Sequence, residues 1–351
     1  MGSETQNVQR KTIAMMRILR DSPEPLGATV IAQRLREHGV ELGERAVRYH
    51  LKLMDQRGFT RLVGRQDGRV LTEQGVEEAG NALVEDKVGS AVSRIEMLAF
   101  RATFDADSLS GLIPVNVSFF PKDMFAQAIH AMKPAFEAGI CMSNLVAVAS
   151  EGEALGNLTV PKGKTGLATV CSIGVNGALL RVGVPIASRF SGILEIRDNK
   201  PVRFVELIEY AGCSLDPSEV FIRAKMTSVG EVASNGHGRV LAGYREIPAP
   251  CRATTDQVVA RLKRAGIEGV LVMGATSEPV CEVAVELNRA GMILLNGLNP
   301  VAAAVEAGIE AENHGMSTLM EYRRLMRFEQ LGACIKRTRK PQKSLAKASG
   351  S

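Results

Sequence analysis

The sequence E-R-A-V-R-Y-H-L-K-L-M-D-Q (Glu44 to Gln56), followed by R-G-F-T-R-L-V-G-R-Q-D-G-R-V-L (Arg57 to Leu71), decides the fold of the N-terminal region. Apolar residues at helical spacing predict a helix over 44–56 with one buried face. Two short β-prone runs, 58–63 and 69–71, flank a turn between Gly64 and Gly68 and predict a β-hairpin. A charged helix followed directly by a hairpin is typical of a DNA-reading helix and its wing.

Two further helices are predicted upstream. The apolar stripe from Ile13 to Leu19 predicts an amphipathic helix, which stops at Asp21-Ser22-Pro23. A second periodic run extends from Ala28 to His38, and Gly39 follows where a left-handed C-cap residue is expected. Three helices and a hairpin predict a winged helix-turn-helix domain, which we place at residues 1–85.

The charge of this region favours DNA as its partner. Residues 8–71 hold 13 Lys plus Arg and 7 Asp plus Glu, a net charge of +6, whereas the whole chain carries only +5. Positive charge is therefore concentrated where a phosphate backbone would lie. A domain that binds protein instead is the alternative. The predicted DNA contacts come from the third helix and from the wing: Arg45, Arg48, Tyr49, Lys52, Arg61, Arg65 and Arg69. We expect His50 on the helix surface.

Composition excludes several classes of function. No apolar run approaches the ~18 residues of a membrane span, so we expect a cytoplasmic protein. The six cysteines form no C-x-x-C pair and the five histidines do not cluster near them, so neither a zinc site nor a disulfide framework is expected. Trp is absent, which disfavours single-strand binding by base stacking. No catalytic or dinucleotide motif is visible, so we predict neither an enzyme nor a bound cofactor.

The rest of the chain predicts a larger α/β domain. We expect a helix from Thr72 to about Ala99, with a helical linker over 86–104, and a mixed α/β domain over 105–331, because strand and helix patterns alternate there. The tail 332–351 is basic and predicts disorder, with an auxiliary phosphate-binding role as the alternative. The expected strands are 115–119, 145–149, 270–273 and 293–295, and the expected helices 123–137, 255–264, 279–289 and 301–307.

A weak internal repeat favours a duplication within this domain. Pro121 precedes Ala138-Gly139-Ile140 by the same 17 positions as Pro248 precedes Ala265-Gly266-Ile267. Further on, Gly174-Val175-Asn176 and Gly297-Leu298-Asn299 are candidates for equivalence, although the offset has changed from 127 to 123. A pseudo-twofold domain would place a ligand cleft between its halves.

The segment Ala168 to Leu180 contains Asn176-Gly177 between β-prone runs, which predicts a tight hairpin with Cys171 just before the turn. A lone cysteine on a strand is usually a small buried hydrophobic residue. Polar residues elsewhere, Thr227, Ser228 and Arg245, are of types that together bind an anionic small molecule.

The chain resembles the archaeal nitrogen regulatory repressor family, NrpR, over nearly all of its length up to about residue 330. The matching segments, in order, are T-V-C-S (169–172) with N-G (176–177), R-F-V-E-L-I-E-Y (203–210), C-S-L-D-P (213–217), M-T-S-V (226–229), R-E-I-P (245–248) and G-L-N-P (297–300).

The resemblance implies a transcriptional repressor of nitrogen fixation and assimilation genes. Such a repressor binds a palindromic operator in double-stranded DNA as a homodimer or larger homo-oligomer, and 2-oxoglutarate releases it. The family's T-V-C-S cysteine is tied to the inducer response and matches Cys171. From residue chemistry and motif position we add Ser172, Asn176, Thr227 and Arg245 as effector-binding candidates.

One departure from the family pattern leaves alternatives open. Some family chains carry two regulatory domains, whereas this chain has one. It is therefore open whether the protein senses 2-oxoglutarate alone or is the DNA-reading subunit beside a second regulatory-domain protein. A scaffold that contacts other regulators without binding DNA is the third reading.

Overall fold

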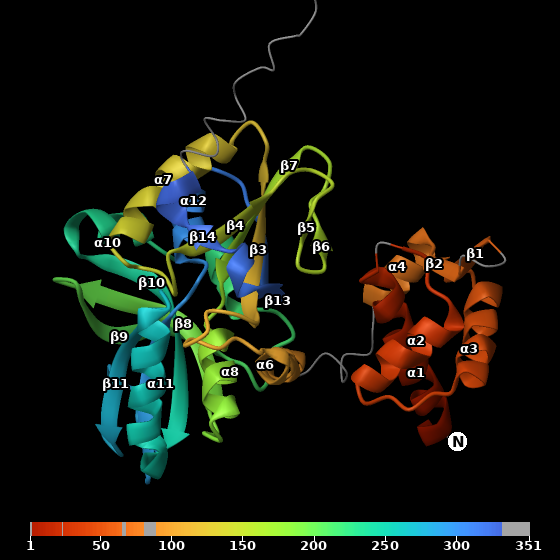
Figure 1. The fold of residues 1–351 in the computed structure, drawn as a ribbon, viewed down its shortest axis with the longest axis horizontal. Helices are drawn as coiled ribbons and strands as arrows, with labels where there is room; N and C mark the ends of the chain where they lie inside the picture. Colours follow the sequence, from red (N-terminus) through yellow and green to blue (C-terminus); the bar gives the residue numbers. More distant parts are fainter. Residues whose placement is uncertain (1, 23, 65–67, 81–88, 332–351) are drawn as a thin grey trace, which may run out of the picture. The chain divides into compact units, whose positions relative to one another are not determined.

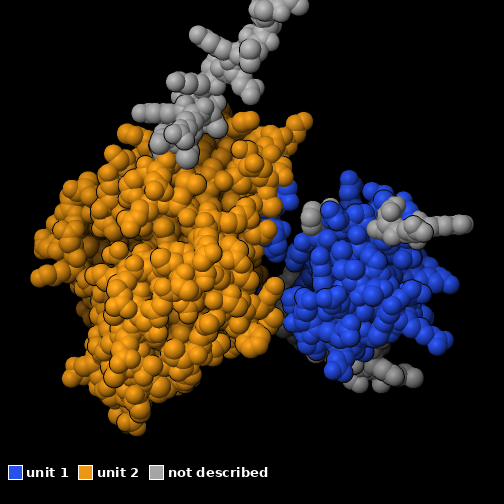
Figure 2. Space-filling view, viewed as in Figure 1, with its two compact units in different colours: residues 1–90, 157–159 blue, residues 91–156, 160–351 orange. Residues whose placement is uncertain are grey.

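The structure, a computed structural model, describes residues 2–22, 24–64, 68–80 and 89–331 (Figure 1). The chain divides into two compact units, residues 1–90 with 157–159 and residues 91–156 with 160–351 (Figure 2). Within the described ranges, no helix has the length and apolar character needed to cross a bilayer. The predicted basic tail, 332–351, lies outside the described residues.

The first unit confirms the winged helix-turn-helix. Its helices pack around a core that includes Ile31, Leu35, Val47 and Leu51, all fully buried. The wing strands pair antiparallel, and a backbone bridge between Leu26 and Arg69 ties the wing to the segment before the second helix. The elements are α1 (Gly2–Arg20), α2 (Ala28–Glu37), α3 (Glu44–Gln56), β1 (Thr60–Gly64), β2 (Gly68–Leu71) and α4 (Glu73–Gly80).

The helix expected from Thr72 to about Ala99 is confirmed over residues 73–80 and 90–99, but the turn at Gly89 shows that it is not one continuous helix. The described parts are α4 and α6 (Ser90–Arg101), and residues 81–88 lie outside the described part. Nor is α6 a linker, because Ala91, Ile95 and Leu98 are buried in the second unit. The second unit therefore begins near residue 91 and includes most of the segment that we expected to connect the domains.

The second unit contains two five-stranded antiparallel sheets, in the orders β13-β3-β7-β4-β14 and β11-β12-β10-β8-β9 (Figure 1). The remaining elements of the chain are, in order, β3 (Leu112–Pro121), α7 (Phe125–Glu137), β4 (Leu145–Ala149), β5 (Ala154–Leu155), β6 (Leu158–Thr159), β7 (Lys164–Val170), α8 (Ile173–Arg181), β8 (Ala187–Arg197), β9 (Lys200–Glu209), α9 (Pro217–Arg223), α10 (Val229–Asn235), β10 (Gly238–Pro248), α11 (Arg252–Arg264), β11 (Val270–Thr276), β12 (Arg289–Leu295), α12 (Asn299–Glu306), β13 (Glu312–Glu321) and β14 (Met326–Arg327).

The topology confirms the internal duplication. Two βαββαβ runs, β3-α7-β4-β7-α8-β8 and β10-α11-β11-β12-α12-β13, follow each other, and each resembles the ferredoxin-like motif. The ends of β3 and β10, residues 121 and 248, are 127 positions apart, and the starts of α8 and α12, residues 173 and 299, are 126 apart. The offset is therefore nearly constant, and the proposed match of Gly174 with Gly297 is out of register.

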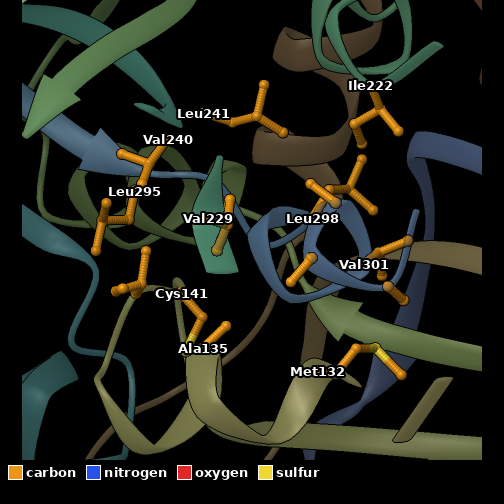
Figure 3. Close-up of a cluster of buried hydrophobic side chains, with 14 of the residues drawn as sticks. Met132, Ala135, Cys141, Ile222, Val229, Val240, Leu241, Leu295, Leu298 and Val301 are labelled. Carbon is orange, nitrogen blue, oxygen red and sulfur yellow. The ribbon is translucent and has the colours of Figure 1, made fainter. Parts of the chain in front are cut away.

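The two halves exchange their last strands. The fourth strand of the first half, β8, pairs with β10, while the fourth strand of the second half, β13, pairs with β3. Each sheet is thus completed by the other half. The main hydrophobic core is shared in the same way, since Met132 of α7, Leu241 of β10 and Val301 of α12 belong to one cluster (Figure 3).

The helix expected over 279–289 is wrong. Residues 278–288 form an irregular connection with a tight turn, in which Val280 and Val283 exchange backbone hydrogen bonds and Cys281 and Glu282 have positive φ. The strands on either side, β11 and β12, are antiparallel neighbours. Such a pair needs no helical crossover, so the apolar spacing here reflects contacts beneath a loop.

The hairpin predicted at Asn176-Gly177 is also wrong, because both residues lie inside α8. A Cβ atom added at Gly177 would lie 2.8 Å from the Ala102 Cβ and 3.1 Å from the Ala99 carbonyl oxygen of α6. The glycine therefore allows two helices to approach closely, and its φ is ordinary for a helix. The local turn signal was overridden by a tertiary contact.

We predict that Gly177→Val lowers the free energy of unfolding by roughly 1–3 kcal/mol, because the added side chain overpacks the α6–α8 contact. Urea unfolding measures this difference. Gly212→Val is the matched control, since nothing lies within 4 Å of a Cβ added at Gly212. Equal stability of the two variants would show that the close approach of α6 and α8 is unimportant.

Candidate functional site

The third helix presents a polar face to solvent. Its inner side buries Val47, Leu51 and Met54 in the core of the first unit. The opposite side exposes all four predicted DNA-contacting side chains of this helix: Arg45, Arg48, Tyr49 and Lys52. Arg48 forms an ion pair with Glu44 one turn earlier, and Tyr49 is 63% exposed. This face combines three basic side chains with an aromatic one, and an α-helix fits the major groove of DNA.

The wing arginines differ in their surroundings. Arg61 is exposed on β1. Arg69 is half-buried, and its Nε lies 2.8 Å from Oδ2 of Asp55, the residue that also accepts a hydrogen bond from Thr60. This pair fastens the wing to the end of α3, so the structure gives Arg69 a supporting role in place of the predicted free phosphate contact. Arg65 lies outside the described residues.

His50 corrects another expectation, because it is buried and does not lie on the helix surface. Its side chain is 8% exposed, and its Nδ1 has no hydrogen-bond partner among the described residues. Burial, followed by the nearby charge of Lys11, lowers the pKa of His50. The recognition helix therefore contains a histidine that is held in its neutral form.

In the second unit, the predicted effector residue Arg245 is almost fully buried, with 1% of its side chain exposed. Its Nη1 donates to the Tyr244 carbonyl at 3.2 Å and its Nη2 to the Ser172 hydroxyl at 3.5 Å. Its Nε has no hydrogen-bond partner among the described residues. Both of these acceptors are neutral, so the buried guanidinium retains much of its capacity to bind an anion.

The strand around Arg245 makes room for its side chain. A Cβ atom added at Gly243 would lie 2.7 Å from Nη1 of Arg245, so the guanidinium lies back over this glycine on the same face of β10. Tyr210, which follows β9, places its ring centroid 5.3 Å from the guanidinium carbon. The aromatic face partly compensates the buried positive charge.

Cys171 and Ser172 lie beside Arg245, in the turn between β7 and α8. Burial raises the pKa of the Cys171 thiol to about 12, against the opposing effect of the Ile173 N–H and of the Arg245 charge. Cys171 is thus a neutral thiol at physiological pH. Asp216 caps α9 by accepting a hydrogen bond from the Ser218 N–H. Burial raises the pKa of the Asp216 carboxyl, and the nearby positive charge of Arg245 opposes this rise. We call Cys171, Ser172, Tyr210, Asp216 and Arg245 the Arg245 cluster.

Asn176 lies next to this cluster, but Thr227 does not join it. The Asn176 side-chain amide donates to the Ser188 hydroxyl at 2.9 Å, and Ser188 is the cross-strand partner of Arg245 on β8. The Asn176 Oδ1 is buried without a partner among the described residues. Thr227 instead lines a separate groove of about 500 Å³ with Lys225 and Glu306. The grouping of Thr227 with Arg245 is therefore wrong.

Sequence reasoning missed Tyr210 and Asp216 as members of the cluster. Both lie in segments that the family resemblance had singled out, R-F-V-E-L-I-E-Y and C-S-L-D-P. The signal for Asp216 was available, because Asp followed by Pro is a helix N-cap pattern. Nothing in the local sequence indicated that Tyr210 would lie under a guanidinium more than thirty residues away.

Comparisons with known proteins identify both units. The model of the NrpR regulatory domains NRD1 and 2 matches residues 88–327, and that of the ribonuclease R winged-helix domain matches residues 13–79. The chain is 38% identical over 315 residues to a global nitrogen regulator NrpRI of Methanosarcina mazei, covering 90% of this chain and 97% of that protein.

Other relatives extend this similarity. A global nitrogen regulator NrpR of Methanococcus maripaludis is 30% identical over 300 residues, which are 86% of this chain and 52% of that longer protein. The crystal structure of a nitrogen repressor-like protein from Methanococcus jannaschii superimposes with a TM-score of 0.57 at 26% identity, covering 68% of this chain and 98% of that one.

We predict that α3 becomes less stable as the pH falls below about 6.5, because a histidine with a lowered pKa in the folded state takes up its proton preferentially on unfolding. The stability is thus present above the pKa of the unfolded state and is lost below it. Hydrogen exchange of the α3 amides at pH 7.5 and 5.5 measures the effect. His50→Leu should reduce the difference between the two pH values, and an unchanged difference would assign the effect to other groups.

Proposed function

This chain belongs to the NrpR family of global nitrogen regulators, and on that basis we propose that it represses nitrogen fixation and assimilation genes and is released from a palindromic operator by 2-oxoglutarate. The chain is a nitrogen-regulating repressor by family. The palindromic operator, the inducer 2-oxoglutarate and the oligomeric state are proposals that go beyond the family assignment. We place this action in the cytoplasm, with no membrane partner.

The DNA side of the proposal is supported by the exposed face of α3. Two copies of a reading helix are needed for the two halves of a palindrome, so we propose a homodimer or larger homo-oligomer. Arg45, Arg48, Tyr49 and Lys52 are then available for base edges and phosphates, while Arg61 reaches the backbone from the wing.

Binding of the inducer is supported by the buried guanidinium of Arg245, whose Nε lacks a hydrogen-bond partner among the described residues. A carboxylate of 2-oxoglutarate provides the anionic acceptor that Arg245 lacks, and Ser172 and Asn176 offer polar groups beside it. Cys171 adds a neutral thiol to the same cluster. Within the described residues Arg245 forms no direct salt bridge, and the buried Asp216 carboxyl, which interacts with the Arg245 charge over a longer distance, is the internal group beside which a ligand carboxylate would bind.

The energetic requirement on the inducer is substantial. Converting mostly bound to mostly free operator requires the ligand to prefer the released state by about 5.5 kcal/mol. Two inducer sites in a dimer share this demand. Because the chain spans only 52% of the Methanococcus maripaludis relative, a second regulatory-domain protein is the alternative source of part of this preference.

The main test is a gel shift with DNA from upstream of a glutamine synthetase or nitrogenase gene, with 2-oxoglutarate titrated in and glutarate as the control. We expect specific retention that 2-oxoglutarate releases and glutarate does not. Arg245→Gln should keep operator binding and lose the release. Retention that ignores 2-oxoglutarate would indicate the DNA-reading subunit of a two-protein sensor, and no specific retention would indicate a scaffold.

We further predict that Arg48→Ala weakens operator binding by about 1–3 kcal/mol, as expected for the loss of a base contact. The affinity for 2-oxoglutarate, measured by calorimetry, should not change, because Arg48 lies in the other unit. Arg36→Ala, an exposed arginine on α2, is the control for a general loss of positive charge. Equal losses for both variants would contradict the assignment of α3 as the reading helix.

A further inference from the structure

We propose that α6 transmits occupation of the Arg245 cluster toward the DNA-binding unit. This inference rests on the proposed function and adds the element through which the inducer acts. The chain enters the second unit through α6, which begins at Ser90. Any change in how α6 is held therefore changes the point from which the connection to the first unit starts.

The apolar face of α6 rests on the ligand site itself. Ala91, Ile95, Leu98 and Ala99 form a hydrophobic cluster with Cys171, Ile173, Tyr210 and Met316. This cluster is distinct from the main core of the unit. Two of its members, Cys171 and Tyr210, belong to the Arg245 cluster. The same side chains thus face the predicted ligand on one side and support α6 on the other.

Backbone and charge contacts fix α6 to the same region. The Ala91 N–H donates to the Cys213 carbonyl at 3.1 Å, and the Cys213 N–H donates to the Tyr210 carbonyl at 3.1 Å. Arg94 lies near Asp216 and Glu219, where burial raises the pKa of both carboxyls and the Arg94 charge opposes that rise. The segment from Tyr210 to Asp216 therefore holds the start of α6.

A close contact with α8 also holds α6 in place. The missing side chain of Gly177 lets α8 approach Ala99 of α6 and Ala102, the residue that follows this helix. The N-terminal end of α8 follows directly after Ser172, which accepts from Arg245. The guanidinium that would bind the inducer therefore contacts Tyr210 and Ser172, which belong to the two segments that support α6.

These contacts give the ligand a physical means of acting at a distance. A ligand shifts an equilibrium only through different interactions in its two states. A carboxylate that binds Arg245 changes the contact of its guanidinium with the Tyr210 ring and with Ser172. Both groups also support α6, so ligand binding changes the free energy with which α6 packs against the Tyr210 segment and α8. This change is a coupling free energy between the two units.

The test compares operator affinity with and without saturating 2-oxoglutarate in Ile95→Ala and in Phe100→Ala. Ile95 is buried against the cluster, whereas Phe100 on the same helix is 76% exposed. We expect Ile95→Ala to keep its affinity for operator without 2-oxoglutarate, and its affinity for 2-oxoglutarate without operator, each within about threefold. The ratio of operator affinities without and with 2-oxoglutarate should fall about tenfold. Phe100→Ala should match the wild type. Ile95→Val, expected to lose less, replaces Ile95→Ala if the latter does not fold.

The outcomes separate this inference from the proposed function. A wild-type protein that binds operator and shows no response to 2-oxoglutarate contradicts the proposed function, and the transmission through α6 with it. A wild type that responds, together with an Ile95→Ala variant that keeps the full release ratio while hydrogen exchange shows a loosened α6, overturns the role of α6 alone. A reduced ratio with unchanged calorimetric binding of 2-oxoglutarate supports it.

Discussion

The exchange of the last strands, β8 and β13, between the two halves is the constraint on which the regulatory unit depends. Because β8 completes the sheet of the second half and β13 completes that of the first, neither sheet is whole without the other half. The exchange also makes the cores continuous, with α7 and α12 contributing to one cluster. A change in the relation of the two halves must disturb both sheets at once, which favours two distinct arrangements over gradual deformation.

The Arg245 cluster follows from this arrangement. Ser172 comes from the first half, Arg245 from the second, and Tyr210 with Asp216 from the segment that connects them. Three stretches distant in sequence therefore meet around one guanidinium. Each stretch also supports a helix, since Ser172 precedes α8, Asp216 caps α9 and Tyr210 packs under α6. A ligand that engaged the guanidinium would meet groups that support α6, α8 and α9. The buried thiol of Cys171 adds a neutral surface to the site, because its raised pKa keeps it protonated.

The DNA-binding unit shows the same division between exposed chemistry and internal support. The outward face of α3 keeps its arginines and Tyr49 available, while Arg69 is committed to Asp55 and holds the wing. A net positive charge of a region thus does not assign each of its arginines to phosphate. The buried His50 adds a neutral polar group to the core of the same helix, at a position where protonation opposes folding.

The sequence by itself determined the winged helix, including the bounds 44–56 of its third helix, because helical periodicity and turn residues act within a few positions of each other. It also indicated the duplication from the spacing of short motifs. Residue chemistry and motif position proposed Ser172, Asn176 and Arg245, and the resemblance to the NrpR family proposed Cys171. Only the tertiary structure decided that Asn176-Gly177 is helical, that residues 278–288 form a loop, that Thr227 lies apart from Arg245 and that Tyr210 and Asp216 join it. Each of these depends on a partner far away in the chain: Gly177 on α6, the loop on the pairing of β11 with β12, and the cluster on the exchange of strands. Local patterns carry no record of such partners, and packing against them outweighs turn and helix propensities that are worth about 1 kcal/mol or less per residue.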